Sequence, residues 1–254
     1  MEKSSVSQNN SSGHSLARHA SVVSVLTLLS RFFGLARDAV IAYVVGAKAS
    51  ADAFYVAFRI PNLFRRLLAE GNLTLSFVPV FTQKFQESKE EARTLASVTM
   101  TALMLFLTLL TLAGIVGASY FVQVTARGFS QYPEKFALTV SLTRITFPYL
   151  ALVSLSALAM GILNARKHFA MPALAPVMLN LGIIVTTFLG NKFWDLPAIA
   201  IAWGVLVGGS LQLLIQIPPL IKRGLLPKLN FNFKNLNFLK VLKLMGPAVH
   251  GSAV

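Results

Sequence analysis

Nine charged residues lie inside, or at the edge of, long stretches of the sequence that are otherwise apolar. The acids and arginines among them are Asp38, Asp52, Glu70, Arg31, Arg37, Arg59, Arg65, Arg66 and Arg144. If these stretches cross a membrane, each charge costs at least about 2.5–3.5 kcal/mol at the bilayer centre, so it must face the bundle interior or a water-filled cavity. The planar fork of arginine donates paired, charge-assisted hydrogen bonds that match a phosphate group. The residue types therefore point to a hydrated chamber that accepts an anion.

The spacing in the first of these stretches places its charges on one side of a helix. Arg31 and Asp38 are seven residues apart, and seven residues of α-helix return to within about 20° of the same direction. Arg37 lies about a third of a turn from that line, where its side chain would flank a wide cavity. This stretch therefore combines an apolar helix with one polar face.

The second stretch repeats this pattern with charges at offsets of seven, seven and four, namely Asp52, Arg59, Arg66 and Glu70. In one continuous helix, these four side chains lie within about 20° of one line. Pro61 interrupts the helix, which makes the alignment approximate. Arg65 lies beside the line, again by about a third of a turn. A second polar face is therefore expected to meet the first.

Two structural interpretations compete with the anion chamber. In one, each arginine is neutralised by a nearby acid, and the pairs join helices. The first two stretches hold five arginines and three acids, which leaves two positive charges in excess, and an unpaired buried cation is costly. In the other, some long side chains extend to the membrane surface. Arg144 stands alone in a later stretch, where a surface position or a helix contact explains it as well as a function does.

The composition indicates a membrane protein. The chain has 254 residues, of which 55% are hydrophobic and 13% are charged, and its mean hydropathy is +0.65. That charged share is about half of what soluble domains usually contain. Lys and Arg number 23 against nine acids, for a net charge of +14. Such an excess fits cytoplasmic loops of a membrane protein as well as an anionic partner such as nucleic acid.

Catalytic and metal chemistry find little support in the sequence. Cysteine is absent, and the four histidines are scattered without the spacing of metal ligands. Asp52 and Glu70 could act as acid and base in a membrane enzyme. However, no nucleophile motif, nucleotide-binding motif or acidic metal cluster accompanies them. We therefore expect no enzyme activity, no catalytic residues and no metal, and we expect Gly208 and Gly209 to serve close helix packing.

Six apolar stretches exceed the roughly 20 residues needed to cross the hydrocarbon core, at residues 20–46, 53–82, 93–124, 136–164, 170–190 and 197–221. We therefore predict an all-α, polytopic membrane helical bundle. The expected parts are a disordered polar tail at 1–19, a lobe of six complete transmembrane helices at 20–226, an interfacial linker at 227–237 and a truncated seventh helix at 238–254. For the linker, whose apolar and polar residues alternate, a short exposed strand stays open as an alternative.

The distribution of Lys and Arg between the loops predicts the orientation. With a cytoplasmic N-terminus, the inner segments hold 13 of these residues and the outer loops hold four. Cytoplasmic loops of membrane proteins carry such an excess. We therefore predict that the N-terminus is cytoplasmic, and the net charge needs no nucleic-acid partner.

Several segments closely resemble the MurJ (MviN) family. They are SRFFGLARDAV (30–40), ADAFYVAFRIPNLFRRLLAEG (51–71), SFVPVF (76–81), RITFPYLALVSLSALAMGILNA (144–165), FAMPALAPVMLN (169–180) and KLMGPAV (243–249). The family comprises lipid II flippases within the multidrug/oligosaccharidyl-lipid/polysaccharide exporter superfamily. Its members have two lobes of membrane helices around a central cationic cavity. The resemblance covers roughly residues 16–254.

The resemblance implies roles for individual residues. Those implied to bind the diphosphate of the lipid are Arg31, Arg37, Arg65 and Arg66, with Arg59 at a position where the family accepts Lys or Arg. Asp52 and Glu70 are implied to take part in gating or charge balance, and Asp38 belongs to the same motif. The implied substrate is lipid II, an undecaprenyl-diphosphate-linked muropeptide, moved between leaflets of the bacterial cytoplasmic (inner) membrane by alternating access.

The resemblance also sets limits on what this portion does. It implies that this portion binds no cofactor. It also implies that transport is coupled to an ion gradient or to the membrane potential, and that the partners are lipid II and membrane lipids. Residues 72–75 depart from the usual run of the family, and the second lobe is missing. The alternatives are another exporter of the superfamily, for a polysaccharide lipid or a drug, and a truncated lobe that is inactive alone.

Overall fold

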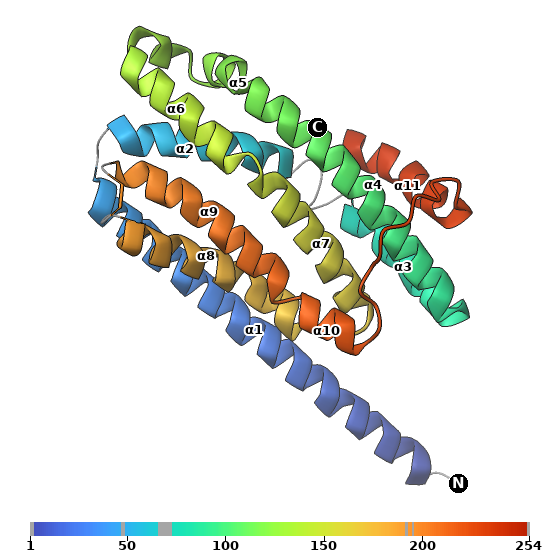
Figure 1. Ribbon diagram of the computed structural model, residues 1–254. Coiled ribbons are helices and arrows are strands. Elements are labelled where there is room, and N and C mark those ends of the chain that lie inside the picture. The colour runs from blue at the N-terminus through green and yellow to red at the C-terminus, as the bar shows by residue number, and fades with distance from the viewer. Residues whose placement is uncertain (1–2, 47–48, 66–72, 191–192, 195, 253–254) are drawn as a thin grey trace.

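The computed structural model describes residues 3–46, 49–65, 73–190, 193–194 and 196–252, and within these residues it is all-helical (Figure 1). The helices are α1 (Lys3–Val45), α2 (Ala49–Arg65), α3 (Thr74–Glu87), α4 (Lys89–Val116), α5 (Ala118–Thr125), the 3₁₀ helix η2 (Arg127–Gln131), α6 (Pro133–Thr146), α7 (Tyr149–Ala165), α8 (Ala170–Gly190), α9 (Pro197–Leu214), α10 (Ile217–Lys222) and α11 (Leu236–Ser252). The predicted all-α class is confirmed.

Four segments of the described chain are long and apolar enough to cross a membrane. They are Lys89–Val116, Pro133–Ala165, Ala170–Gly190 and Pro197–Lys222. These correspond to the third, fourth, fifth and sixth predicted spans. The first two predicted spans, which carry most of the intramembrane arginines and acids of the sequence, are not among these four segments. The hydropathy of the described residues thus supports a membrane bundle, while the count of six complete spans stays a prediction.

Three predicted spans are each divided into two helices. The span at 93–124 breaks at Gly117 between α4 and α5, and the span at 136–164 breaks at Pro148 between α6 and α7. The span at 197–221 breaks after Leu214, just before the proline pair that opens α10. Proline has no N–H to donate to the preceding turn, so a helix tends to end before it. The fifth span needs no correction, because α8 has the predicted bounds.

The second predicted span is not one helix across the described residues. Its first part is α2, which packs against α6, α7 and α9, and its second part lies in α3, which packs against α4, α7 and α11. Figure 1 shows α2 and α3 in different parts of the lobe. Of the charges that the sequence aligned along one helix, Asp52 and Arg59 both lie on α2. Arg66 and Glu70 lie outside the described residues.

The two ends of the chain also differ from the sequence-based expectation. Helix α1 begins at Lys3, although residues 1–19 read as a disordered tail. Once a helix has formed, each further residue adds a hydrogen bond, so it can extend into Ser- and Asn-rich sequence. Between α10 and α11 the chain has no regular strand over residues 225–235, so the strand alternative for the linker is not adopted, and α11 begins two residues before position 238.

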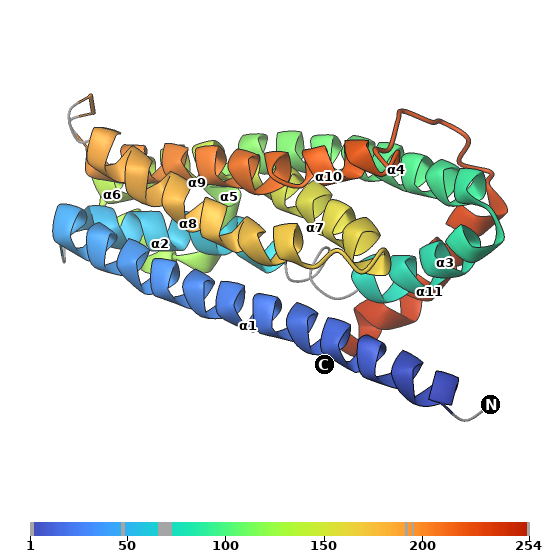
Figure 2. The same ribbon diagram turned by 90° about the horizontal axis from the view of Figure 1, so that it is seen from below.

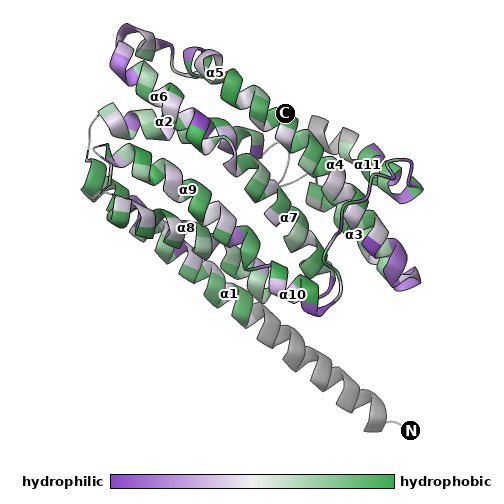
Figure 3. Cartoon of the chain, in the orientation of Figure 1, coloured by the Kyte–Doolittle hydropathy of each residue, from purple (hydrophilic) through white to green (hydrophobic). Residues whose placement is uncertain are grey.

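Helices α1, α8 and α9 form one side of the lobe (Figures 1 and 2). Glycines allow α8 and α9 to approach closely, because a Cβ atom added to Gly182 would lie 2.3 Å from the Cα of Gly208. A Cβ atom added to Gly208 would lie 2.4 Å from the carbonyl oxygen of Leu179. The expected packing role of Gly208 is confirmed. Figure 3 shows that hydrophobic residues dominate α7, α8 and α9, while hydrophilic residues gather near the α3–α4 junction and before α11.

Candidate functional site

Helix α2 has one open face that carries charge. Its exposed residues recur every three or four positions, at Asp52, Tyr55, Arg59 and Leu63. The opposite side packs into the lobe through residues such as Phe54, Ala57 and Ile60, each no more than 2% exposed. Residues three, four or seven apart share a helix face, so Asp52 and Arg59 point the same way, out of the packed lobe.

A hollow of about 480 Å³ opens along this face, lined by Tyr55, Phe58, Arg59, Asn62, Leu63 and Arg65. The side chain of Arg65 is oriented by Asn62, whose Oδ1 accepts a hydrogen bond from the Arg65 Nε at 3.1 Å. Two guanidinium groups thus share the hollow with aromatic and aliphatic side chains. Such a mixture suits an anion attached to an apolar or sugar-like body.

Arg37 of α1 is held by a buried asparagine on α8. Its Nη1 donates to the Oδ1 of Asn180 at 3.0 Å, and its Nε and Nη2 donate to Asp38 Oδ1 at 3.0 and 2.8 Å. Asn180 is only 6% exposed, and its Nδ2 donates to the carbonyl oxygen of Ser30 at 3.3 Å. The guanidinium of Arg37 is therefore fixed between α1 and α8 and is also paired with an acid.

Arg31 lies on an exposed position of α1, on the face that it shares with Asp38. Neither Arg31 nor Arg59 forms an ion pair with any acid in the part of the chain that the structure describes. Both positively charged side chains lie at exposed positions, Arg31 on α1 and Arg59 on α2. An external anion could therefore approach both guanidinium groups.

Asp52 pairs with a lysine that the sequence analysis did not single out. The Nζ of Lys135 in α6 lies 2.8 Å from the Oδ2 of Asp52, and it also lies 4.1 Å from the ring centre of Phe129. The Lys135 side chain is 19% exposed and the Asp52 side chain 64%. Asp52 therefore joins α2 to α6 near the start of both helices.

The structure brings some of the predicted site residues together and leaves others apart. The hollow on α2 holds Arg59 and Arg65, whereas Arg31 and Arg37 of α1 do not line it. Arg144 is exposed on α6, and Arg66 and Glu70 lie outside the described residues. Across the described ranges, no three His, Asp or Glu side chains gather where they could hold a metal ion. In the described part of the chain, the hollow is thus lined by residues of α2, and a chamber shared with the arginines of α1 stays a prediction.

Two partners of the charged residues escaped the sequence analysis. Asn180 is a polar residue in an otherwise apolar helix. Such a residue usually faces a neighbouring helix, so its position could have predicted a contact between helices. Lys135 gave no comparable signal, since it belongs to a polar loop-like region of the sequence. The contacts of Arg37 with Asn180 and of Asp52 with Lys135 join residues far apart along the chain. The spacing of residues within one helix cannot predict such contacts.

Comparison with known proteins identifies the family. The family model "Lipid II flippase MurJ" matches residues 41–254. A "Probable lipid II flippase MurJ" of Buchnera aphidicola subsp. Schizaphis graminum is 40% identical over 231 residues, covering 91% of this chain and 45% of the relative. The "Lipid II flippase MurJ" of Burkholderia cenocepacia is 42% identical over 244 residues, covering 94% of this chain and 47% of the relative.

A solved structure agrees with these relatives. It is a lipid II flippase MurJ in an inward closed conformation, with a TM-score of 0.75 and 29% identity, and the match covers 91% of this chain and 47% of that chain. The chain spans about half the length of the curated relatives it matches. With its apolar helices, it is a multi-pass protein of the bacterial inner membrane. The family match over most of its length means that the chain belongs to the MurJ family.

Proposed function

We propose that this chain supplies one lobe of a lipid II flippase and that arginines on α1 and α2 bind the diphosphate of the lipid. The relatives are named lipid II flippases, and the chain spans about half of their length. The observation that carries the proposal is the hollow on α2, which holds Arg59 and Arg65 on an open face of the lobe. The chain would act as a transporter rather than as an enzyme.

The charge balance of the described residues supports an anionic substrate. Asp38 is paired with Arg37 and Asp52 with Lys135, so these acids do not neutralise Arg31 or Arg59. A hydrogen bond to a charged group contributes about 1.5–3 kcal/mol, and a guanidinium offers two such bonds to one phosphate. Arg31, Arg59 and Arg65 would recognise the diphosphate, with Arg37 held in place by Asn180. Arg66 would join them, and Asp38, Asp52 and Glu70 would balance charge or take part in gating.

The proposed mechanism is alternating access. In two-lobed transporters, one lobe rocks against the other around a central site, so the substrate is exposed first to one leaflet and then to the other. This lobe would provide one cationic wall of the site, and the other half of a full-length relative would provide the opposite wall. Transport would use an ion gradient or the membrane potential, with no cofactor in this portion.

The orientation belongs to the same proposal. The 13-to-4 excess of Lys and Arg in alternate loops places the N-terminus and the α3–α4 junction in the cytoplasm. Because the chain contains no cysteine, single cysteines at positions 89 and 167 can report their side of the membrane. Reaction of either with an impermeant thiol reagent from outside the cell would contradict this orientation.

The test of the proposed function uses cells depleted of their own flippase. The chain is expressed alone and together with the second half of the Burkholderia cenocepacia relative, and lipid II exposure on the outer leaflet is measured beside membrane abundance. We expect exposure with the two halves and none with the chain alone. Joint replacement of Arg59 and Arg65 by Ala should abolish exposure at unchanged abundance, while the matched change Arg127→Ala, at an exposed position outside the site, should not.

The other outcomes separate the alternatives. Export of a different polysaccharide lipid or of a cationic drug by the two halves, without lipid II exposure, would favour another exporter of the superfamily. Restored exposure that persists after removal of both arginines would end the case for diphosphate recognition at this hollow. Loss of membrane abundance in the arginine variants would instead identify Arg59 and Arg65 as structural contacts between helices.

A further inference from the structure

The segment between α10 and α11, residues 225–235, crosses the first part of α4, and we call it the strap. Its backbone is fixed to two hydroxyl groups of α4. The N–H of Lys228 donates to Ser97 Oγ at 3.0 Å, and the N–H of Asn230 donates to Thr101 Oγ1 at 2.9 Å. Both hydroxyls belong to buried residues. The strap therefore has a defined position on α4 although it contains no helix or strand.

The side chains of the strap and its neighbours are both basic and apolar. Leu229 and Phe231 are each 64% exposed, and Leu236 at the start of α11 is 82% exposed. From residue 217 to residue 254 the sequence contains no acid, but it contains Lys222, Arg223, Lys228, Lys234, Lys240 and Lys243. Exposed Leu and Phe beside lysines are typical of segments that lie on an anionic membrane surface.

The length of α4 places the strap near that surface. A helix of 28 residues is about 42 Å long, roughly 12 Å more than the hydrocarbon core. The charged first turn at Lys89, Glu90 and Glu91 identifies the end that extends beyond the core. Ser97 and Thr101 lie two to three turns further along, so the strap crosses α4 close to the boundary between headgroups and hydrocarbon.

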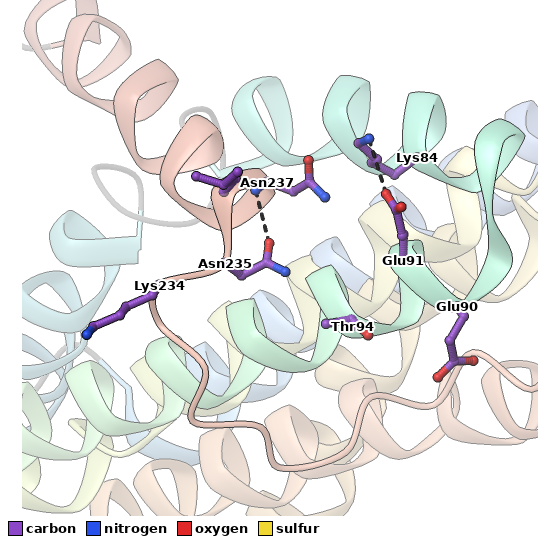
Figure 4. Close-up of a pocket in the computed structure, with 8 residues that line it drawn as sticks. Lys84, Glu90, Glu91, Thr94, Lys234, Asn235 and Asn237 are labelled. Carbon is purple, nitrogen blue, oxygen red and sulfur yellow. Dashed lines mark hydrogen bonds and ion pairs between the residues drawn. The ribbon is translucent and has the colours of Figure 1, made fainter.

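Two hollows flank the strap, and their charges differ. The first, of about 580 Å³, contains Lys84 and Lys234 together with Glu90 and Glu91 (Figure 4). Lys84 is already paired there, because its Nζ lies 2.6 Å from Glu87 and 3.1 Å from Glu91. An anion would meet two carboxylates in this hollow, so it is poorly suited to a phosphate.

The second hollow, of about 290 Å³, is lined by both Arg93 of α4 and Lys228 of the strap. Its single acid is Glu90, and the contact from Glu90 Oε2 to Arg93 Nη1 is long, at 3.5 Å. Leu226 and Leu229 form the apolar part of the lining. One phosphate would therefore find a guanidinium and an ammonium group, with leucines beside them for the first carbons of an acyl chain.

We propose that this second hollow binds the phosphate headgroup of an anionic phospholipid of the bilayer, held by Arg93 and Lys228 with its chains against Leu226 and Leu229. The bound lipid is a resident of the membrane and not the transported molecule, so the proposal does not depend on lipid II flipping. It assigns the strap a role in attaching the α3–α4 end of the lobe to the membrane surface.

The test measures lipid preference next to the strap. A single cysteine is introduced by Asn232→Cys and labelled with a fluorophore, and the chain is reconstituted in phosphatidylcholine nanodiscs. Phosphatidylglycerol or phosphatidylcholine carrying a nitroxide on the acyl chain is then added at equal fractions. We expect the labelled phosphatidylglycerol to quench several-fold more strongly. Lys228→Gln and Arg93→Gln should each weaken its apparent affinity about fivefold, since one basic residue near an anionic surface contributes on this scale.

Controls separate the site from general charge and from folding. Arg127→Gln removes one exposed cation outside the strap region and should leave the preference unchanged, whereas Lys228→Arg should retain it. Size-exclusion profiles of all variants report folding, and Lys228 is exposed, so its replacement should not unfold the chain. Equal quenching by the two lipids in the unmodified chain, or an undiminished preference after Lys228→Gln, would overturn the proposal.

Discussion

The helix pair α8 and α9 differs from the helices α1 and α2 in the side chains that its contact faces carry. Between α8 and α9, Gly182 and Gly208 bring two backbones into contact, and the surrounding residues are almost entirely apolar. Helices α1 and α2 instead carry Arg31 and Arg59 on exposed faces. In a membrane, small residues favour close helix packing, while ionisable residues mark polar pathways.

The comparison shows how one lobe divides two tasks between neighbouring helices. Helices α8 and α9 are expected to keep a fixed position relative to each other, because their backbones are in close-packed contact. Helix α1 packs against α8, where Arg37 donates to Asn180, and α2 packs against α9. Substitutions in the first pair should therefore act on the amount of folded protein, and substitutions in the second should act on transport.

The largest effect is expected at the α8–α9 crossing. Gly182→Leu should prevent normal folding, because even a Cβ atom there would lie 2.3 Å from the backbone of Gly208 and forced overpacking typically costs about 1–3 kcal/mol or more. Membrane abundance and thermal unfolding in detergent measure this effect. Gly128→Leu serves as the matched control, since no atom lies within 4 Å of a Cβ at that position. Normal abundance of the Gly182 variant would mean that the two helices can separate.

The next effect concerns the charged faces and should leave abundance unchanged. Arg31→Lys keeps the charge but loses the two-pronged hydrogen bonding of the guanidinium. Loss of one charge-assisted bond of about 1.5 kcal/mol should reduce outer-leaflet lipid II exposure about tenfold when the second half of a relative is present. Full exposure in this variant, beside strong loss in Arg31→Ala, would show that Arg31 acts through charge alone.

Particular residues show how far the sequence could predict this arrangement. The bounds of α8 and the packing role of Gly208 follow from hydrophobicity and residue size, which are local properties. The division of the second span into α2 and α3 depends on which helices each part contacts, and no local pattern contains that information. The same holds for the contact of Arg37 with Asn180 and that of Asp52 with Lys135, which join residues 143 and 83 positions apart.

A smaller effect should appear at Asn180, which connects the two regions. Asn180→Ala removes one hydrogen-bond partner of Arg37, and a buried partner of a charged group contributes about 1.5–3 kcal/mol. Because Asn180 would act on transport only through Arg37, only part of this energy should reach transport, and we expect lipid II exposure to fall about fivefold. If Asn180 acts by positioning Arg37, the double variant with Arg37→Ala should be no worse than Arg37→Ala alone. Thr187→Val is a control on the same helix, because its hydroxyl bonds only to the carbonyl of Ile183 among the described contacts.

Additive losses in that double variant would contradict the positioning role. They would mean that Asn180 affects transport by a route separate from Arg37, for example through its other hydrogen bond to the carbonyl of Ser30. Restoration of exposure by Asn180→Gln would support positioning, because glutamine keeps the amide while moving it by one carbon. The abundance of each variant shows whether the α1–α8 contact itself has been lost.

The smallest effect is expected for the ion pair between Asp52 and Lys135. The Asp52 side chain is 64% exposed, and exposed pairs contribute about 0.2–1 kcal/mol. A double-mutant cycle with Asp52→Asn and Lys135→Gln should give a coupling energy in that range for thermal unfolding in detergent, and the coupling should shrink as salt is added. Transport distinguishes two roles for Asp52. If the aspartate only joins α2 to α6, both single changes should affect lipid II exposure equally little. If it also takes part in gating, Asp52→Asn should reduce exposure where Lys135→Gln does not, and equal effects would therefore remove Asp52 from the set of gating residues.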